Sequence, residues 1–139
     1  MEPYKLIDLR ASDTGNGSLT MLQSGARGAI PFDIKKILLV QGMKPGDVRG
    51  KHAHRETQEV IVALRGGCDI AIDDGSTVHS VPLRGMSHAL FLPPRVWRTL
   101  KNFDEGTVLL LIANQEYDEK EYVREYGEFT KLVAATKKK

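Results

Sequence analysis

Short apolar runs separated by turn residues make up most of the chain. The runs that indicate strands are residues 34–40, 60–64, 68–72, 77–83, 89–92 and 107–113. Asp74-Gly75 between two of these runs is a strong hairpin signal. Pro93-Pro94 ends another run, because proline cannot continue a central strand. No alternation of strands with helices is visible, so the pattern predicts an all-β sandwich or barrel.

One helix is expected, over residues 119–132 near the C-terminal end. Tyr122, Tyr126 and Phe129 recur at i, i+4 and i+7, which places them on one apolar face and favours helix packing. Asp118 is expected to be the N-cap. A chain of 139 residues with no internal repeat or linker suffices for one core. We therefore predict a single domain over residues 1–139.

Composition narrows the class of protein. Hydrophobic residues make up 41% and charged residues 27% of the chain, which is ordinary for a soluble domain. The net charge of +2 argues against a nucleic-acid partner, and residues 137–139 are interpreted as a solvated end. No run is long enough to span a bilayer, and no signal peptide is expected. The single cysteine, Cys68, is expected to pack as a small apolar residue, so we expect a cytoplasmic protein without a membrane partner.

The candidate chemistry lies in a histidine pair. His52 and His54 are two residues apart, which places both imidazoles on one face of an extended strand. Adjacent imidazoles inside a barrel can bind a metal or share proton transfer. Together with Glu59 they would form a two-histidine, one-carboxylate set that suits Fe(II) or a similar divalent ion. The spacing alone leaves metal binding and acid–base chemistry both open.

The segment around these histidines resembles a known motif. The spacing of the first cupin motif is matched by Gly46, His52, His54, Glu59 and Gly66. The second cupin motif is matched in part over residues 93–102, where Asn102 fits and Arg98 stands at the histidine position. This resemblance implies a cupin double-stranded β-helix, which is a jelly-roll barrel, with a short C-terminal helix.

Within the cupins, the chain resembles the sugar-nucleotide 3,4-ketoisomerases. The matching segments are residues 17–19, 30–36, 49–54, 93–97 and 117–126. The resemblance implies an isomerase that moves a carbonyl between adjacent ring carbons of a dTDP-4-keto-6-deoxyhexose, in deoxyamino-sugar biosynthesis. It implies no cofactor, no metal and a dTDP-linked sugar as partner. It also implies a homodimer in which the N-terminal strands, about residues 1–30, contribute across the interface.

The resemblance further implies roles for single residues. His52 is expected to be the base and His54 its partner acid, because an imidazole pKa of about 6.5 suits proton transfer near neutrality. Arg49 is expected close to the sugar or the diphosphate. The other expected substrate-binding residues are Lys51, Glu59, Trp97, Arg98, Asn102 and Arg124. Two further histidines, His79 and His88, match no motif and are interpreted as structural.

Three positions depart from the family pattern. Leu38 stands where the family has an active-site tyrosine, Arg98 where it has histidine, and Glu59 where glutamine is common. Leucine can neither donate a hydrogen bond nor carry a proton. Three alternatives therefore stay open. They are a ketoisomerase with a changed sugar or regiochemistry, a metal-dependent cupin enzyme using His52, His54 and Glu59, and a non-catalytic nucleotide-sugar-binding protein.

Overall fold

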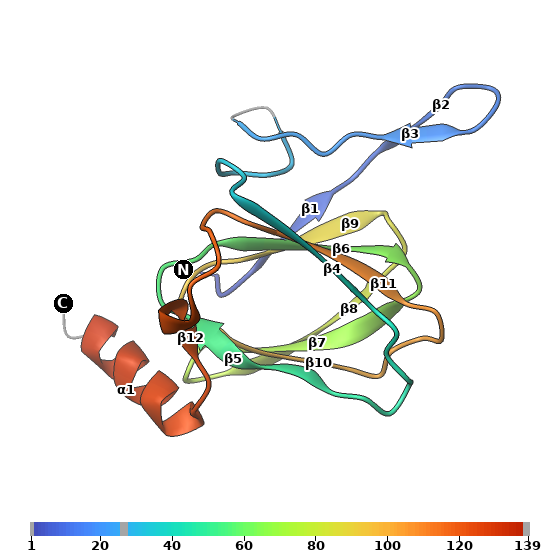
Figure 1. Cartoon of the computed structure of the whole chain (residues 1–139). Helices are drawn as coiled ribbons and strands as arrows, with labels where there is room; N and C mark the ends of the chain where they lie inside the picture. The colour runs from blue at the N-terminus through green and yellow to red at the C-terminus, as the bar shows by residue number, and fades with distance from the viewer. Residues whose placement is uncertain (1, 26–27, 138–139) are drawn as a thin grey trace.

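The strands form two five-stranded antiparallel sheets packed face to face, in a computed structural model that describes residues 2–25 and 28–137 (Figure 1). The first sheet has the order β1 (Lys5–Asp8), β9 (His88–Leu92), β6 (Glu59–Arg65), β11 (Val108–Ala113), β4 (Lys36–Gln41). The second has the order β12 (Tyr122–Val123), β5 (Arg49–His54), β10 (Trp97–Lys101), β7 (Gly67–Asp73), β8 (Val78–Arg84). This arrangement confirms the all-β, cupin-type barrel.

The turn between β7 and β8 is stabilised by residues of the turn itself. The Asp73 and Asp74 carboxylates accept hydrogen bonds from the backbone N–H groups of Gly75 and Thr77, at 2.7 and 2.8 Å. Gly75 has a φ of 95°, a left-handed conformation that glycine adopts without steric cost. The predicted hairpin is confirmed, and β7 and β8 pair along their whole length.

The apolar core fills the space between the two sheets. Strand β6 is buried on both faces: Ile61 faces the core, whereas Val60 packs on the outer side against Leu9 and Ile30 of the N-terminal segment. This double burial explains its continuous apolar sequence. Cys68 is fully buried, as expected for a small apolar residue, and burial raises the pKa of its thiol to about 12.

The predicted helix over residues 119–132 is wrong in its first part. Residues Glu119–Glu121 form a single 3₁₀ turn, η1, and the helix α1 runs from Tyr126 to Lys137. Asp118 is a cap as expected, but it caps η1, where its side chain accepts from the N–H of Lys120 at 3.0 Å. The helix therefore starts later than the apolar spacing predicted.

Strand β12 lies between η1 and α1 and takes the place of the expected first helical turn. Tyr122 pairs with His54 and Val123 with Ala53, so this short strand extends the second sheet beside β5. Val123 is fully buried in a cluster with Ala53 of β5 and with Phe129 and Val133 of α1. Phe129 of α1 is fully buried against the same cluster, which confirms its expected role in helix packing.

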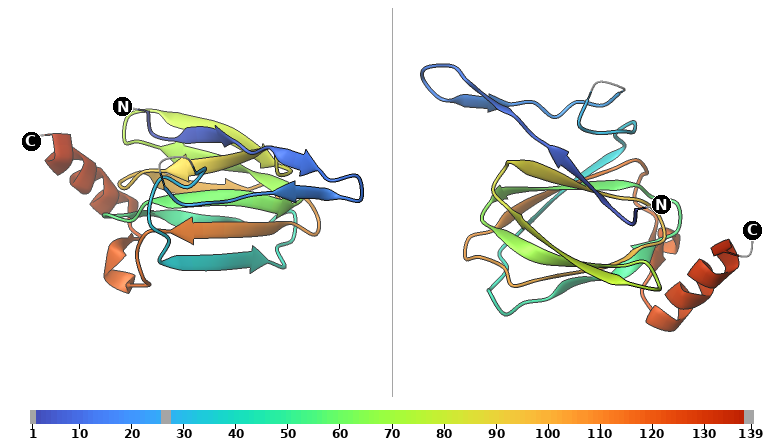
Figure 2. Two further views of the ribbon diagram at one scale, coloured as in Figure 1. Left: turned by 90° about the horizontal axis from the view of Figure 1, so that it is seen from above. Right: turned by 180° about the vertical axis from the view of Figure 1, so that it is seen from behind.

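The N-terminal segment extends beyond the barrel. Strand β1 joins the edge of the first sheet, and β2 (Ala11–Asp13) and β3 (Ser18–Thr20) form a two-stranded ribbon that projects outward (Figures 1 and 2). Part of the expected interface segment 1–30, namely residues 1 and 26–27, lies outside the described residues, as do residues 138–139 of the expected solvated end. No helix in the described part of the chain has the length and apolar character needed to cross a membrane.

Candidate active site

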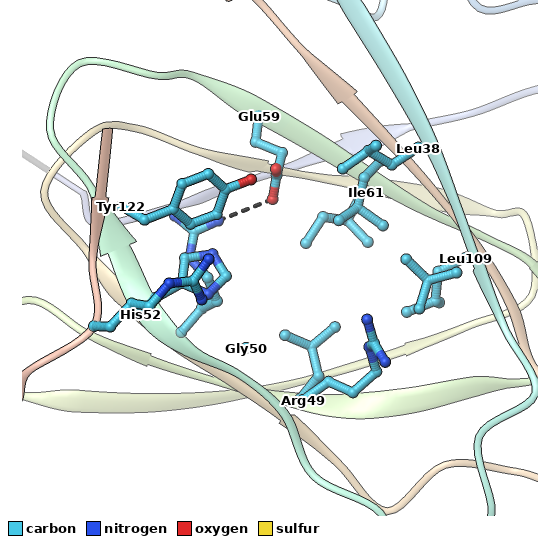
Figure 3. A pocket seen from close by; sticks show the side chains of 13 residues that line it. Leu38, Arg49, Gly50, His52, Glu59, Ile61, Leu109 and Tyr122 are labelled. Atoms are coloured by element: carbon cyan, nitrogen blue, oxygen red, sulfur yellow. Dashed lines mark hydrogen bonds and ion pairs between the residues drawn. The ribbon is translucent and has the colours of Figure 1, made fainter. Parts of the chain in front are cut away.

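A cavity of about 260 Å³ lies between the two sheets and collects polar side chains from several elements (Figure 3). Its polar lining consists of Arg49, His52, Glu59, Arg98, Tyr122 and Arg124. The remaining wall is apolar and is formed by Leu38, Val40, Gly50, Ile61, Leu100, Leu109 and Leu111. Five of the nine residues assigned to a site from the sequence therefore converge on one cavity.

Strands from both sheets position these side chains. Strand β5 carries Arg49 and His52, and β10 pairs with it so that Arg98 lies opposite His52. Glu59 comes from β6 of the facing sheet. The close approach of β5 and β10 depends on Gly50, because a Cβ there would lie 2.9 Å from the backbone oxygen of Arg98. Its φ of 85° also favours glycine.

The two histidines lie side by side, as the alternation of a strand predicted. Their ring centroids are 4.9 Å apart and the ring planes are nearly perpendicular. His52 lines the cavity, whereas His54 is 1% exposed and lies behind it. Burial, reinforced by the charge of Arg98, lowers the pKa of His52 to about 4 and that of His54 to about 2. Both imidazoles are therefore neutral at pH 7 and can accept a proton.

Arg98 and Glu59 form a buried ion pair beside the histidines. The Nη1 of Arg98 donates to Oε1 of Glu59 at 2.9 Å, and the two side chains are 2% and 5% exposed. Burial raises the pKa of the Glu59 carboxyl, and the neighbouring guanidinium opposes this effect. Arg98 thus neither reaches the rim nor lies free in the cavity, because its charge is compensated within the barrel.

This ion pair bears on the expected metal set. The second carboxylate oxygen of Glu59 lies 3.9 Å from Nε2 of His54, and its first is bonded to Arg98. Among the residues that the structure describes, no three histidine, cysteine or carboxylate side chains are grouped to hold a metal ion. A guanidinium beside the carboxylate repels a cation, so the set of His52, His54 and Glu59 does not fit a metal site.

Among the polar residues that line the cavity, Tyr122 is the one that the sequence interpretation missed. It was expected to pack α1, but its ring lies 5.0 Å from the ring of His52 and 4.6 Å from that of His54. Its hydroxyl points into the cavity on the side of Glu59 (Figure 3). A signal was present, since Tyr122 lies two positions before Arg124 in the segment that resembles the ketoisomerases.

Arg124 covers the outer face of this tyrosine. Its guanidinium carbon lies 4.6 Å from the centre of the Tyr122 ring, and its Nε donates to Oε1 of Glu119 at 2.7 Å. Lys36 of β4 approaches from the other sheet, with Nζ 5.9 Å from the same ring centre. Cations close to an aromatic ring are attracted by its π electrons, so Arg124 and Lys36 both stabilise the position of the Tyr122 ring. Lys36 was also missed, because only the folded barrel brings β4 near β12.

Three expected substrate-binding residues lie outside the lining. Lys51 is exposed, with a φ of 55° in the irregular part of β5. Trp97 packs on α1, with its ring 5.3 Å from that of Tyr126. Asn102 donates from its amide to Oδ2 of Asp69 at 2.9 Å. The structure thus leaves Lys51 exposed and places Trp97 and Asn102 in contacts away from the histidine pair.

Of the three other positions discussed in the sequence analysis, Leu38 lines the cavity, whereas His79 and His88 do not. Leu38 lines the cavity as a half-buried side chain, so this position faces the interior as expected. His79 and His88 do not line it: the ring of His79 contacts that of Tyr4, and Nε2 of His88 lies 3.0 Å from Oδ1 of Asp8.

A family model described as FdtA: WxcM-like, C-terminal matches residues 2–134, which is nearly the whole described barrel. The chain belongs to the FdtA family. A relative from Aneurinibacillus thermoaerophilus, named TDP-4-oxo-6-deoxy-alpha-D-glucose-3,4-oxoisomerase, is 32% identical over 130 residues, covering 94% of this chain and 92% of that protein. The expected ketoisomerase family is thereby confirmed, and its named activity is that of an isomerase.

Solved structures agree with this family membership. A 3,4-ketoisomerase from Helicobacter canadensis is 37% identical, with a TM-score of 0.89 over 94% of this chain and 97% of that one. A variant of the 3,4-ketoisomerase QdtA from Thermoanaerobacterium thermosaccharolyticum, in complex with TDP-4-keto-6-deoxyglucose, is 28% identical, with a TM-score of 0.90 over 97% and 96% of the chains. The FdtA-family barrel described above is therefore shared closely with known ketoisomerases.

Proposed function

We propose that this FdtA-family protein is a 3,4-ketoisomerase of a TDP-linked 4-keto-6-deoxyhexose. The observation that carries the proposal is the neutral His52 on the cavity wall, backed by His54 and flanked by arginines. The relatives named above act on TDP sugars of this kind. Moving a carbonyl to the adjacent carbon needs a base that is unprotonated at neutral pH, and this site provides one.

The reaction can be written as a balanced set of proton transfers. His52 takes the proton from C3, and the electron pair of that C–H bond forms the C3–C4 double bond of an enediolate. The C3 hydroxyl loses its proton, the C4 oxygen gains one, and the imidazolium returns a proton to C4. The product carries its carbonyl at C3. The oxidation of C3 is balanced by the reduction of C4 within the same sugar, so the scheme needs no external oxidant or reductant.

His54 is suited to act through His52 rather than on the sugar. It is almost fully buried, does not line the cavity, and lies with its ring centroid 4.9 Å from that of His52. From this place it holds the orientation of the His52 ring and completes the acid–base pair. Its position behind the wall makes His52 the group that meets the substrate carbon.

Two arginines are proposed to bind the diphosphate. Arg49 and Arg124 both line the cavity, and both side chains remain exposed to solvent. A guanidinium donates two parallel hydrogen bonds that match the oxygens of a phosphate. Their exposure is what a site for the charged end of a nucleotide sugar requires, while the buried part of the cavity receives the hexose.

We also propose that the protein is a homodimer with its N-terminal ribbon at the interface. Leu19 on this ribbon and Met21, which directly follows it, are 57% and 65% exposed. Ile37 and Leu39 are 57% and 61% exposed on edge strand β4. Exposed apolar groups of this size are typical of protein contact surfaces. Sedimentation velocity tests the proposal: a species of twice the 15.5 kDa chain mass supports it, and a monomer at micromolar concentration contradicts it.

The activity is tested by incubation with TDP-4-keto-6-deoxyglucose in deuterated water, followed by NMR of the sugar. We expect a 3-keto product with solvent deuterium at C4. His52→Asn should lower turnover by at least about 100-fold without changing the melting temperature, because it removes a positioned base. His79→Asn, which changes a histidine outside the cavity, is the matched control. A wild-type protein without product or exchange would refute the activity, and an active His52→Asn variant would refute the assignment of the base.

A further inference from the structure

Arg124, which lines the cavity, forms an ion pair with Glu119, which does not. The Nε and Nη2 of Arg124 donate to the two carboxylate oxygens of Glu119, at 2.7 and 3.1 Å. Hydrogen bonds from Arg124 and Tyr117 lower the pKa of the Glu119 carboxyl to about 2, so this group is charged at neutral pH. The guanidinium proposed to bind the diphosphate is therefore already bonded to an anion of the protein.

The geometry of this pair is the one in which arginine binds a phosphate group. A guanidinium donates two parallel hydrogen bonds, and carboxylate and phosphate groups both present two oxygens that accept them. Glu119 accepts from Nε and from Nη2, so it occupies one complete edge of the Arg124 guanidinium. Its carboxylate thus uses the donors that a phosphate of the substrate would need.

Exposure distinguishes this ion pair from the one inside the barrel. The side chains of Arg124 and Glu119 are 52% and 56% exposed, whereas those of Arg98 and Glu59 are 2% and 5% exposed. When an exposed pair separates, water solvates both charges, so such a pair contributes little to stability. Arg124 can therefore exchange the Glu119 carboxylate for another anion at low cost, which the buried pair cannot do.

The turn η1, which carries Glu119, is fixed to the barrel by its backbone. The Nε of Arg55 donates to the carbonyl oxygen of Lys120 at 3.1 Å, and the backbone N–H of Arg55 donates to that of Glu121 at 3.0 Å. Rotation of an exposed side chain is fast and needs no movement of the backbone. The carboxylate of Glu119 can thus leave Arg124 while η1 stays in place.

We propose that Glu119 is an internal competitor of the substrate diphosphate, which bonds Arg124 before the nucleotide sugar binds and must give up this guanidinium when it does. Glu119 then sets the affinity for the nucleotide below the value that the arginines alone would give. The inference rests on the proposed function, and in particular on binding of the diphosphate by Arg124.

Calorimetric titration with TDP at low ionic strength tests this inference. Glutamine at position 119 keeps an oxygen for Arg124 and Tyr117 but removes the charge, so Glu119→Gln should bind TDP about fivefold more tightly, the most that an exposed ion pair usually contributes. Glu128→Gln is the matched control, because Glu128 pairs with Arg55 at the surface and does not line the cavity. Its affinity for TDP should stay within about twofold of the wild-type value.

An Arg124→Met background shows whether the effect passes through the ion pair. In that background Glu119→Gln should change TDP affinity by less than about twofold, because no guanidinium is left to compete for. An equal gain in affinity with and without Arg124 would mean that the carboxylate only repels the nucleotide, and would overturn the proposal. The variants should keep the wild-type melting temperature, since both side chains are exposed.

The outcomes separate this inference from the proposed function. A wild-type protein that does not bind TDP would overturn both. If the wild type binds TDP and Glu119→Gln binds it equally or more weakly, Glu119 positions Arg124 rather than competing for it, and this inference alone is wrong. The titration needs no turnover, so a protein that binds TDP without isomerising a TDP sugar would refute the activity while the titration still decides the role of Glu119.

Discussion

Replacing Glu59 with glutamine removes the counterion of a guanidinium that has almost no contact with water. The Arg98 and Glu59 side chains are 2% and 5% exposed, and their hydrogen bond is 2.9 Å long. In the Glu59→Gln variant, Arg98 keeps its charge but loses the carboxylate that compensates it. The guanidinium lies too deep for water to take over that role.

The magnitude follows from burial. Breaking a buried ion pair by changing one partner costs about 3–5 kcal/mol. Glutamine retains an oxygen that accepts a hydrogen bond from Arg98, which places the expected loss at the lower end, about 3 kcal/mol. For a domain of this size, about 3 °C is lost per kcal/mol, so the melting temperature should fall by about 9 °C.

A second arginine–glutamate pair in the same molecule provides the control. Arg95 donates to Glu56 at 2.6 Å, but the two side chains are 35% and 61% exposed. An exposed pair contributes at most about 1 kcal/mol, so Glu56→Gln should lower the melting temperature by no more than about 3 °C.

Thermal unfolding of both variants at pH 7, with circular dichroism or calorimetry, checks this comparison. It is made at equal protein concentration, since oligomerisation contributes to apparent stability. Equal small shifts for the two variants would refute the argument that burial of the Arg98–Glu59 pair makes its carboxylate necessary.

Two further predictions concern the reaction and its substrate. Because His52 must be neutral to act as a base and burial with the charge of Arg98 lowers its pKa to about 4, the acid limb of kcat/KM should lie near pH 4. A profile measured between pH 4 and pH 8 that instead falls near pH 6.5 would show an unshifted base. Arg49→Met should weaken TDP binding about 10- to 100-fold by calorimetry, because charge-assisted hydrogen bonds contribute about 1.5–3 kcal/mol. Lys51→Met should change it less than threefold, and equal effects would contradict the assignment of Arg49.

Local patterns predicted several strands but misplaced the C-terminal helix. The turn at Asp74-Gly75 carries its own hydrogen bonds and a glycine conformation, so neighbouring residues determine it. The spacing of Tyr122, Tyr126 and Phe129 fits a single helix, yet only Tyr126 and Phe129 lie in α1, whereas Tyr122 lies in β12. What moves Tyr122 into a strand is the free edge of β5, which lies far away in the sequence.

In the candidate site, too, some features follow from the local sequence and others depend on contacts between distant strands. His52 and His54 share one face because alternation along a strand is a local property, and both were identified from their spacing. The pairing of Glu59 with Arg98 joins residues from two facing sheets. By itself Glu59 suggested a metal ligand and Arg98 suggested a binding site for an anion. Only their contact shows that the two side chains are bonded to each other.

The sequence by itself determined the barrel class, the histidine pair and the family to which they belong. These features depend on alternation, turn chemistry and motif spacing, which act over a few residues. Only the tertiary structure decided which polar groups surround His52, that its pKa is lowered, and that the hydroxyl of Tyr122 enters the cavity. Burial and charge proximity arise when distant strands pack together, so they have no counterpart in local sequence.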